Sequence, residues 1–459
     1  MSNSKQVKHL WVRAGFGMRF EDFNEYGNSS INHVVKHLLK GESTSTAIST
    51  VPNNNDYEAL IKGDIMARKM FLQNQKQQEK DLNLAWINQM SATDAPLLEK
   101  MTFFWHNHFA CRTNNAQFAQ QLNNIQRSNA LGNFRTLLFQ VAESPAMLQF
   151  LNNQQNQKGH PNENFARELM ELFTIGRGNY TETDIKESAR AFTGYGFNRT
   201  GEFVNRKFFH DDGIKTFMGK TGNFTGEDIM NMILERKETA HFISNKLYKY
   251  FVNENPDPEH VNAMANVFYK ADYEIKPLLE YIFTADWFYD DKNTGNLIKS
   301  PIELLVGLNR QFYISYKQAD VLLQFQHVLG QVLFYPPNVA GWPGGKNWID
   351  SSSLMYRLKI PSILLNSGLI DFNGKADPED EAYIAAVRNQ QQMVATRVQA
   401  VPDWNKFFQY VPKSMGKTAI AQFMLEPKPG NTLINSINQA TDIKTMVIEL
   451  VSTPEYQLC

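Results

Sequence analysis

Ser300-Pro301-Ile302-Glu303-Leu304-Leu305-Val306-Gly307-Leu308 is the stretch that most clearly indicates the fold, because it contains a complete helix start. Serine is a favoured N-cap, proline suits the first helical position, and Glu303 can complete a capping box. Apolar residues then follow at helical spacing. Similar starts occur at Ser144-Pro145, at Thr181 with Asp184, and at Thr225 with Asp228.

Signals for strands are few. The best candidate is Phe197 to Phe209, where Asn198-Arg199-Thr200-Gly201 could turn a hairpin. The sequence therefore predicts a mainly α fold, a large multi-helix bundle-like domain with a small β-hairpin near residues 197–209. Gly41 to Asp56 and Gly368 to Asp380 have the composition of loops. We expect a main helical domain over residues 1–367 and a C-terminal helical segment over residues 368–459, packed on the same body.

Composition narrows the class of protein. Of the 459 residues, 42% are hydrophobic and 20% are charged, which permits a packed core. A net charge of −1 provides no broad basic surface, so we expect no nucleic-acid partner. No apolar run is long enough for a membrane span. Met1 to Lys5 shows no signal peptide, and the two cysteines, Cys111 and Cys459, cannot form a disulfide framework, so the chain as given is expected to be cytoplasmic.

Two histidines stand close together in the aromatic segment Glu99 to Phe109. If the segment is helical, His106 and His108 point about 160° apart and cannot chelate one ion. If it is extended, they share a face and can do so. The alternative is that each is a core histidine held by a hydrogen bond.

A second polar segment, Lys158 to Phe173, contains Pro161 at a suitable first helical position. A helix here would be cleanly amphipathic, with Glu163, Arg167 and Glu171 spaced for ion pairs on a surface. If its polar face lines a cleft instead, Glu168 and Glu171 could bind a metal or act as an acid and base pair, joined by His160. Both interpretations remain open.

Two shorter stretches complete the candidates. His210-Asp211-Asp212-Gly213 offers nitrogen and oxygen ligands for a divalent ion, but it is also an ordinary turn sequence. Gly219-Lys220-Thr221 ends like a phosphate-binding loop. Its upstream glycine, Gly213, lies one residue too early, so no nucleotide cofactor is expected.

Together these stretches make the chain resemble the bacterial family named domain of unknown function 1800. The resemblance extends over essentially the whole chain. The stretches that carry it are Arg13-Ala14-Gly15-Phe16-Gly17, Phe104 to Phe109, Gly159 to Asn164, Ala166 to Phe173, His210 to Gly213, Lys220-Thr221-Gly222, Lys299-Ser300-Pro301, Pro336 to Val339, Gly341 to Gly345 and Pro454-Glu455-Tyr456.

The resemblance implies a largely helical fold and supplies no accepted active site. Genes of the family often lie beside those of a phosphatase- or sulfatase-like family, and many members look exported, whereas this chain shows no signal. A family defined by polar stretches implies either a fully paired structural network or a site.

Two functions follow as expectations. The first is a metal-assisted hydrolase, in which neutral histidines and carboxylates hold a divalent ion that activates water. Its catalytic candidates are His160, Glu168 and Glu171, and its metal-ligand candidates are His106, His108, His160, Glu168, Glu171, His210, Asp211 and Asp212. The second is a non-enzymatic binding or assembly protein that acts with the phosphatase- or sulfatase-like partner.

Helix geometry predicts which of the hydrolase candidates lie together. Pro161 would fix the start of one helix, and the aromatic helix over residues 96–109 would pack beside it. We therefore predict that His106, His160, Glu168 and Glu171 form one cluster.

Overall fold

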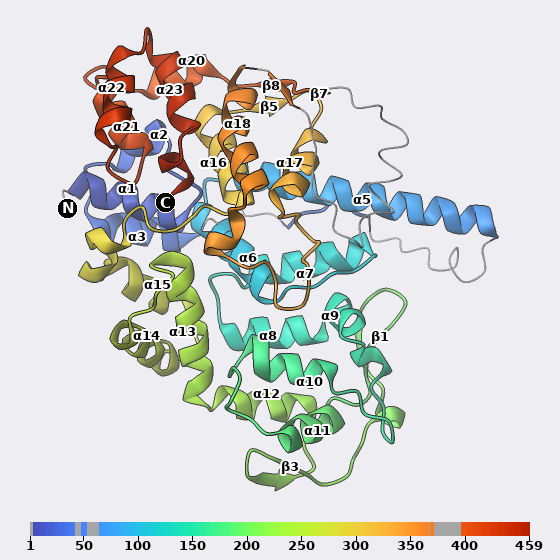
Figure 1. The fold of residues 1–459 in the computed structure, drawn as a ribbon. Coiled ribbons are helices and arrows are strands. Elements are labelled where there is room, and N and C mark those ends of the chain that lie inside the picture. Colours follow the sequence, from blue (N-terminus) through green and yellow to red (C-terminus); the bar gives the residue numbers. More distant parts are fainter. Residues whose placement is uncertain (1–2, 42–46, 53–63, 367, 371–395) are drawn as a thin grey trace.

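The computed structural model describes residues 3–41, 47–52, 64–366, 368–370 and 396–459, and it is mainly α as predicted (Figure 1). The first helices are α1 (Asn3–Ala14), α2 (Phe20–Tyr26), α3 (Ile31–Lys40), α5 (Ile65–Ala92), α6 (Pro96–His108), α7 (Ala116–Ser128), α8 (Phe134–Glu143), α9 (Pro145–Phe150), α10 (Asn164–Glu168), the π-helix η2 (Leu169–Phe173) and α11 (Glu182–Ala191). The later helices are α12 (Gly226–Leu234), α13 (Lys237–Phe251), α14 (Pro258–Lys270), α15 (Ile275–Thr284), α16 (Pro301–Phe312), α17 (Val321–Leu329), α18 (Ser351–Asn366), α20 (Trp404–Tyr410), α21 (Lys417–Met424), α22 (Asn431–Gln439) and α23 (Ile443–Val451). Short 3-10 turns are η1 (Asn153–Gln155), η3 (Lys207–Phe209), η4 (Asp286–Tyr289), η5 (Asp291–Asn293), η6 (Gly345–Trp348) and η7 (Glu455–Gln457).

The predicted helix starts are confirmed. The Ser300 hydroxyl accepts the backbone N–H of Glu303, and the Glu303 carboxylate accepts the N–H of Ser300, which is a complete capping box. Thr181 begins α11 and Thr225 begins α12 with the same reciprocal bonds. Ser144 caps α9, with proline at its first position.

The strands form two-stranded antiparallel pairs. β1 (Tyr195–Phe197) pairs with β2 (Phe203–Asn205), which confirms the predicted hairpin close to its expected place. The Asn198 side chain organises its turn by accepting the N–H groups of Thr200 and Glu202. The remaining pairs join β3 (Lys215–Phe217) to β4 (Lys220–Gly222), β5 (Ser315–Tyr316) to β8 (Ala400–Val401), and β6 (Leu369–Ile370) to β7 (Thr396–Arg397).

Gly201 in the first hairpin gives a direct test of the fold. Its φ of +84° is left-handed, and a Cβ there would lie 2.8 Å from the ring of Phe118, which is fully buried. Gly219 in the second hairpin has a similar φ of +80° but open space around it. We expect Gly201→Ala to lower the free energy of unfolding by about 1–3 kcal/mol more than Gly219→Ala, because only the first adds overpacking to the backbone penalty. Urea unfolding of both variants measures this, and equal losses would contradict it.

Helix α6 lies at the centre of the body and contacts α1, α3, α5 and α7 (Figure 1). It is buried almost all the way round, as expected of a core helix. Below it in Figure 1, α8 to α12 form a layer with the first two hairpins. The C-terminal helices pack on the same body, since α20 contacts α2 and α16, and α23 contacts α18. The predicted loops over Gly41 to Asp56 and Gly368 to Asp380 fall largely outside the described residues.

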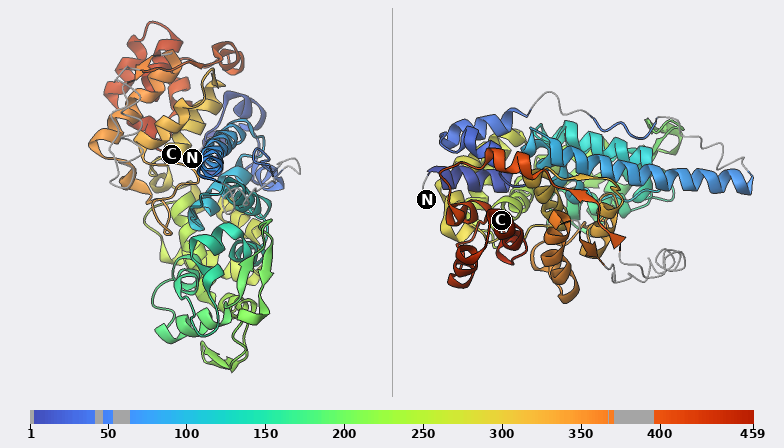
Figure 2. Two further views of the ribbon diagram at one scale, coloured as in Figure 1. Left: turned by 90° about the vertical axis from the view of Figure 1, so that its right-hand side faces the viewer. Right: turned by 90° about the horizontal axis from the view of Figure 1, so that it is seen from above.

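Helix α5 extends beyond the rest of the molecule (Figures 1 and 2). Its projecting end exposes apolar side chains, and Ile65 and Met66 are 87% and 72% exposed. Its other end is buried through Leu82, Trp86 and Met90. Within the described ranges, no helix is both long and apolar enough to span a membrane.

Candidate functional site

The segment that carries His106 and His108 is helical, so the extended alternative does not apply. His106 is buried, and its Nε2 accepts the backbone N–H of Phe334 at 3.1 Å. Its ring packs against those of Trp86 and Trp342, with centroids 4.9 and 5.6 Å away. Burial lowers the pKa of His106 to about 3, so the ring is neutral. These are the contacts of a core histidine.

His108 faces a different part of the core. Its Nε2 lies 3.1 Å from the carbonyl oxygen of Phe173, and its Nδ1 lies 3.1 Å from Nζ of Lys246. Lys246 also donates to the carbonyl of Leu172 at 3.0 Å. His108 therefore donates through Nε2 and accepts at Nδ1, and burial lowers its pKa. Together the two side chains bind the last carbonyls of η2, which have no partner within the helix.

His160 lies in an exposed loop before α10. The prediction that Pro161 starts the helix is wrong, because α10 begins at Asn164. The reason is local: the Asn156 side chain accepts the N–H of Asn162, and the Asn162 side chain accepts the N–H of Asn164. These bonds hold residues 157–163 in a turn, as asparagine side chains commonly do. His160 is therefore in the turn, farther from the helix than expected.

The predicted regular helix widens into a π-helix at Leu169. The Thr174 hydroxyl donates to the carbonyl of Leu169 at 2.5 Å, and the N–H of Gly176 donates to the carbonyl of Met170 at 2.8 Å. These bonds end the π turn after Phe173. Single π turns are rare and are found frequently at functional sites. Glu168 is the last residue before this turn, and Glu171 lies within it.

Glu168 and Glu171 have opposite electrostatic environments. Burial disfavours the charge of Glu171, but bonds from Arg177 and from the Tyr180 hydroxyl, at 2.9 Å, outweigh it and lower the pKa of Glu171. Burial raises the pKa of Glu168, and the negative charge of Glu171 raises it further. Among the described residues, Glu168 has no hydrogen-bond or ion-pair partner. The pair thus combines a carboxyl whose pKa is raised with one whose pKa is lowered.

The predicted row of ion pairs is only partly formed. Arg167 pairs with Glu163 at 3.2 Å, as expected, and with Glu182 at 2.9 Å. Glu171 pairs with Arg177 instead, because the π turn displaces it from the regular spacing. The polar face therefore divides into a surface network and the separate carboxylate pair.

The third candidate stretch forms a turn between η3 and the second hairpin. Nδ1 of His210 lies 2.9 Å from the carbonyl of Thr193, Asp211 pairs with Arg190 at 2.8 Å, and Asp212 is exposed. Gly219 occupies the turn between β3 and β4, and Lys220 pairs with Glu235. Thus Gly219-Lys220-Thr221 lies in a hairpin, whereas a phosphate-binding loop leads into a helix.

The positions of the predicted His, Asp and Glu ligands show whether they could bind one metal ion. In the parts of the chain that the structure describes, no three His, Cys, Asp or Glu side chains are placed to hold one ion. The predicted cluster of His106, His160, Glu168 and Glu171 is thus not assembled as a metal site. Nε2 of His106 and both ring nitrogens of His108 are used by backbone groups or Lys246, and His160 remains in its exposed turn. The described side chains of this region are therefore not arranged as the ligand set of a metal ion.

Sequence reasoning missed two features of this region. Lys246 is separated from His108 by well over a hundred residues, so no local pattern links them. The π turn has the same apolar residues as an α-helix would have. The aromatic residues around His106 and His108 were the sequence signal that α6 lies in the core.

The chain is thus a mainly α protein with a carboxylate pair at a π turn. The chain matches the family model described as "Protein of unknown function (DUF1800)" over residues 9–458, and it belongs to that family. No curated protein and no solved structure shows significant similarity to it.

Proposed function

We propose that this protein is a hydrolase in which Glu168 is the general acid and Glu171 the general base. The observation that carries the proposal is the carboxyl pair at the π turn, in which Arg177 and Tyr180 hold Glu171 while Glu168 has no hydrogen-bond partner among the described residues. The pKa values of the two groups accordingly shift in opposite directions. Pairs of titratable groups whose environments drive their pKa values apart commonly divide acid and base roles in this way. The reaction class is the cleavage of a bond to an oxygen leaving group.

Each carboxyl has one task in this scheme. Glu168, which retains its proton to higher pH, donates it to the leaving oxygen as the bond breaks. Glu171, which stays ionised, accepts a proton from the attacking water. Arg177 and Tyr180 are positioning residues, since they orient Glu171 through hydrogen bonds. His108 and Lys246 support the same segment by binding its terminal carbonyls.

A panel of chromogenic nitrophenyl esters, phosphates and glycosides tests the proposal. We expect turnover of one class by the wild type, and a loss of about 100-fold or more in Glu168→Gln. Glu182→Gln is the matched control, because Glu182 is an exposed carboxylate that pairs with Arg167. It should retain wild-type activity. Equal activity in Glu168→Gln and the wild type would refute the assignment.

One observation favours a second function, a binding or assembly protein that acts with a phosphatase- or sulfatase-like partner. The projecting end of α5 exposes Ile65, Met66, Met70 and Leu72, and exposed apolar patches often mark protein contacts. Size-exclusion chromatography of mixtures with such a partner tests this. A complex lost on Met66→Lys but retained on Lys69→Met would support it, and no complex would refute it.

A further inference from the structure

Lys246 lies on α13 and contacts the end of η2. Its Nζ donates to the carbonyl oxygen of Leu172 at 3.0 Å and to Nδ1 of His108 at 3.1 Å. Nζ also lies 4.8 Å from the centre of the Phe242 ring. The side chain is half-buried, and no carboxylate pairs with it among the described residues. The proposed hydrolysis gives this amine no chemical role.

The number of acceptors around Nζ matches the neutral form of this lysine. A charged ammonium group has three N–H donors and no lone pair, whereas a neutral amine has two N–H groups and one lone pair. His108 accepts at Nδ1, because its Nε2 donates to the carbonyl of Phe173 at 3.1 Å. His108 and Leu172 therefore bind the two N–H groups of an amine, and the lone pair of Nζ has no partner in the described part of the chain.

Lys215, at the start of β3, shows the opposite arrangement. It is fully buried, and its Nζ donates to three acceptors. These are the carbonyl of Asp211, the carbonyl of Gly213 at 3.0 Å and Oδ1 of Asn223 at 3.2 Å. Three acceptors match the three protons of an ammonium group, so Lys215 has no lone pair to offer and no exposed surface.

The surroundings of Lys246 also favour the amine. Burial lowers the pKa of Lys246 to about 8. At pH 7 a lysine with that pKa is neutral about 10% of the time, against about 0.04% for an ordinary lysine. Burial lowers the pKa of Lys215 as well, so the acceptors and the accessible surface are what distinguish the two side chains. Desolvated lysine amines commonly form Schiff bases with carbonyl compounds.

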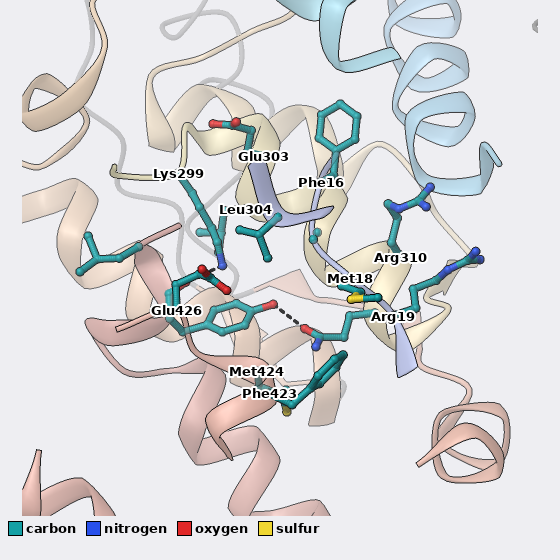
Figure 3. Close-up of a pocket in the computed structure, with 16 residues that line it drawn as sticks. Phe16, Met18, Arg19, Lys299, Glu303, Leu304, Arg310, Phe423, Met424 and Glu426 are labelled. Carbon is teal, nitrogen blue, oxygen red and sulfur yellow. Dashed lines mark hydrogen bonds between the residues drawn. The ribbon is translucent and has the colours of Figure 1, made fainter. Parts of the chain in front are cut away.

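Lys299 shows that a lowered pKa is not sufficient for such a reaction. Burial lowers its pKa to about 8 as well. It lines a small cavity together with Glu303 and Glu426 (Figure 3), and its Nζ donates to the carbonyl of Tyr456 at 2.7 Å. The cavity volume of about 30 Å³ corresponds to about two waters, which leaves no room for an aldehyde of several heavy atoms.

We propose that Lys246 binds an uncharged aldehyde covalently as a Schiff base, a function beyond the proposed hydrolysis. The lone pair of Nζ forms a bond to the carbonyl carbon, and the C–O bond of the aldehyde breaks as the C=N bond forms. The two N–H protons of the amine leave with the oxygen as water, so no further reactant is needed. His108 is a positioning residue, because its hydrogen bond orients the lone pair. The ligand is uncharged, since no charged side chain among the described residues contacts Nζ to balance a ligand charge.

Propionaldehyde with sodium cyanoborohydride is the probe, because the reductant converts the imine into a stable amine that peptide mass spectrometry locates. In the folded wild-type protein at pH 7, Lys246 should be labelled at least about tenfold faster than Lys249, an exposed lysine on the same helix. Lys215 and Lys299 should stay unlabelled. Glyoxylate, a charged aldehyde, should give a lower ratio of Lys246 to Lys249 labelling. Equal labelling of these two lysines by propionaldehyde, or an equally high ratio with glyoxylate, would overturn the proposal.

Two variants and one unfolded sample test whether the fold creates this reactivity. Lys246→Met should abolish the fast labelling, and the matched control Lys249→Met should retain it at Lys246. Wild-type protein in urea should label both lysines at similar rates, and selectivity that persists there would contradict a role of the fold. If Lys246→Met does not fold, the peptide map of the wild type still decides the result. Glu168→Gln should label like the wild type, so a failure of the proposed hydrolysis is distinguishable from a failure of this proposal.

Discussion

Replacing Glu99 by glutamine is expected to lower the free energy of unfolding by about 3–5 kcal/mol, the usual effect of removing one partner from a buried ion pair. Glu99 is fully buried in α6. Arg127 donates to its two oxygens at 2.8 and 3.2 Å. Trp86 and Gln89 donate to the same carboxylate at 2.9 and 2.8 Å. A glutamine amide would turn an NH₂ toward these donors and leave Arg127 without its counter-charge.

Urea unfolding measures this loss. Glu182→Gln removes an exposed carboxylate from Arg167 and should leave the stability almost unchanged, because solvent screens such a pair. The double variant Glu99→Met with Arg127→Met should be more stable than Glu99→Gln, because it removes both charges and leaves none unpaired. If Glu99→Gln is as stable as Glu182→Gln, the buried pair of Glu99 and Arg127 does not stabilise the fold in this way.

Local signals explain what the sequence could predict. A capping box needs only residues three apart, so Ser300 with Glu303 and Thr181 with Asp184 could be recognised without knowledge of the fold. The hairpin near Gly201 depends on a four-residue turn in the same way. Glu168 and Glu171 were found because they belong to one polar segment.

Contacts between segments that are far apart in the sequence explain which features the sequence could not predict. Lys8 and Glu426 pair across more than four hundred residues, and Lys100 and Glu303 across two hundred. No periodicity encodes such pairs, so these buried charges were not foreseen. His106 and Glu168, which were predicted to share one cluster, belong to no three-residue set of metal ligands among the described residues. The polar atoms of α6 are used by core partners, chiefly Phe334 and Arg127, which only the fold brings to it.

The pH dependence of the proposed hydrolysis is the most specific test of the roles given to Glu168 and Glu171. In the proposed mechanism, activity requires ionised Glu171 and protonated Glu168. It should therefore rise with pH through the lowered pKa of Glu171 and fall through the raised pKa of Glu168. The resulting bell has its acid limb below, and its alkaline limb above, the ordinary glutamate range of about 4.3.

Glu168→Gln should reduce kcat by about 10²–10⁴-fold and remove the alkaline limb, since an amide cannot donate an ionisable proton. Glu171→Gln should remove the acid limb instead.

Measurements of stability distinguish the proposed role of Glu168 as general acid from a purely structural role. Folding raises the pKa of Glu168, so the folded protein loses stability as pH rises from the unfolded pKa to the folded pKa. Glu168→Gln lacks that loss, and its melting temperature at neutral pH should equal or exceed that of the wild type. A marked fall in melting temperature together with an unchanged pH profile would show that Glu168 holds the fold and is not the acid.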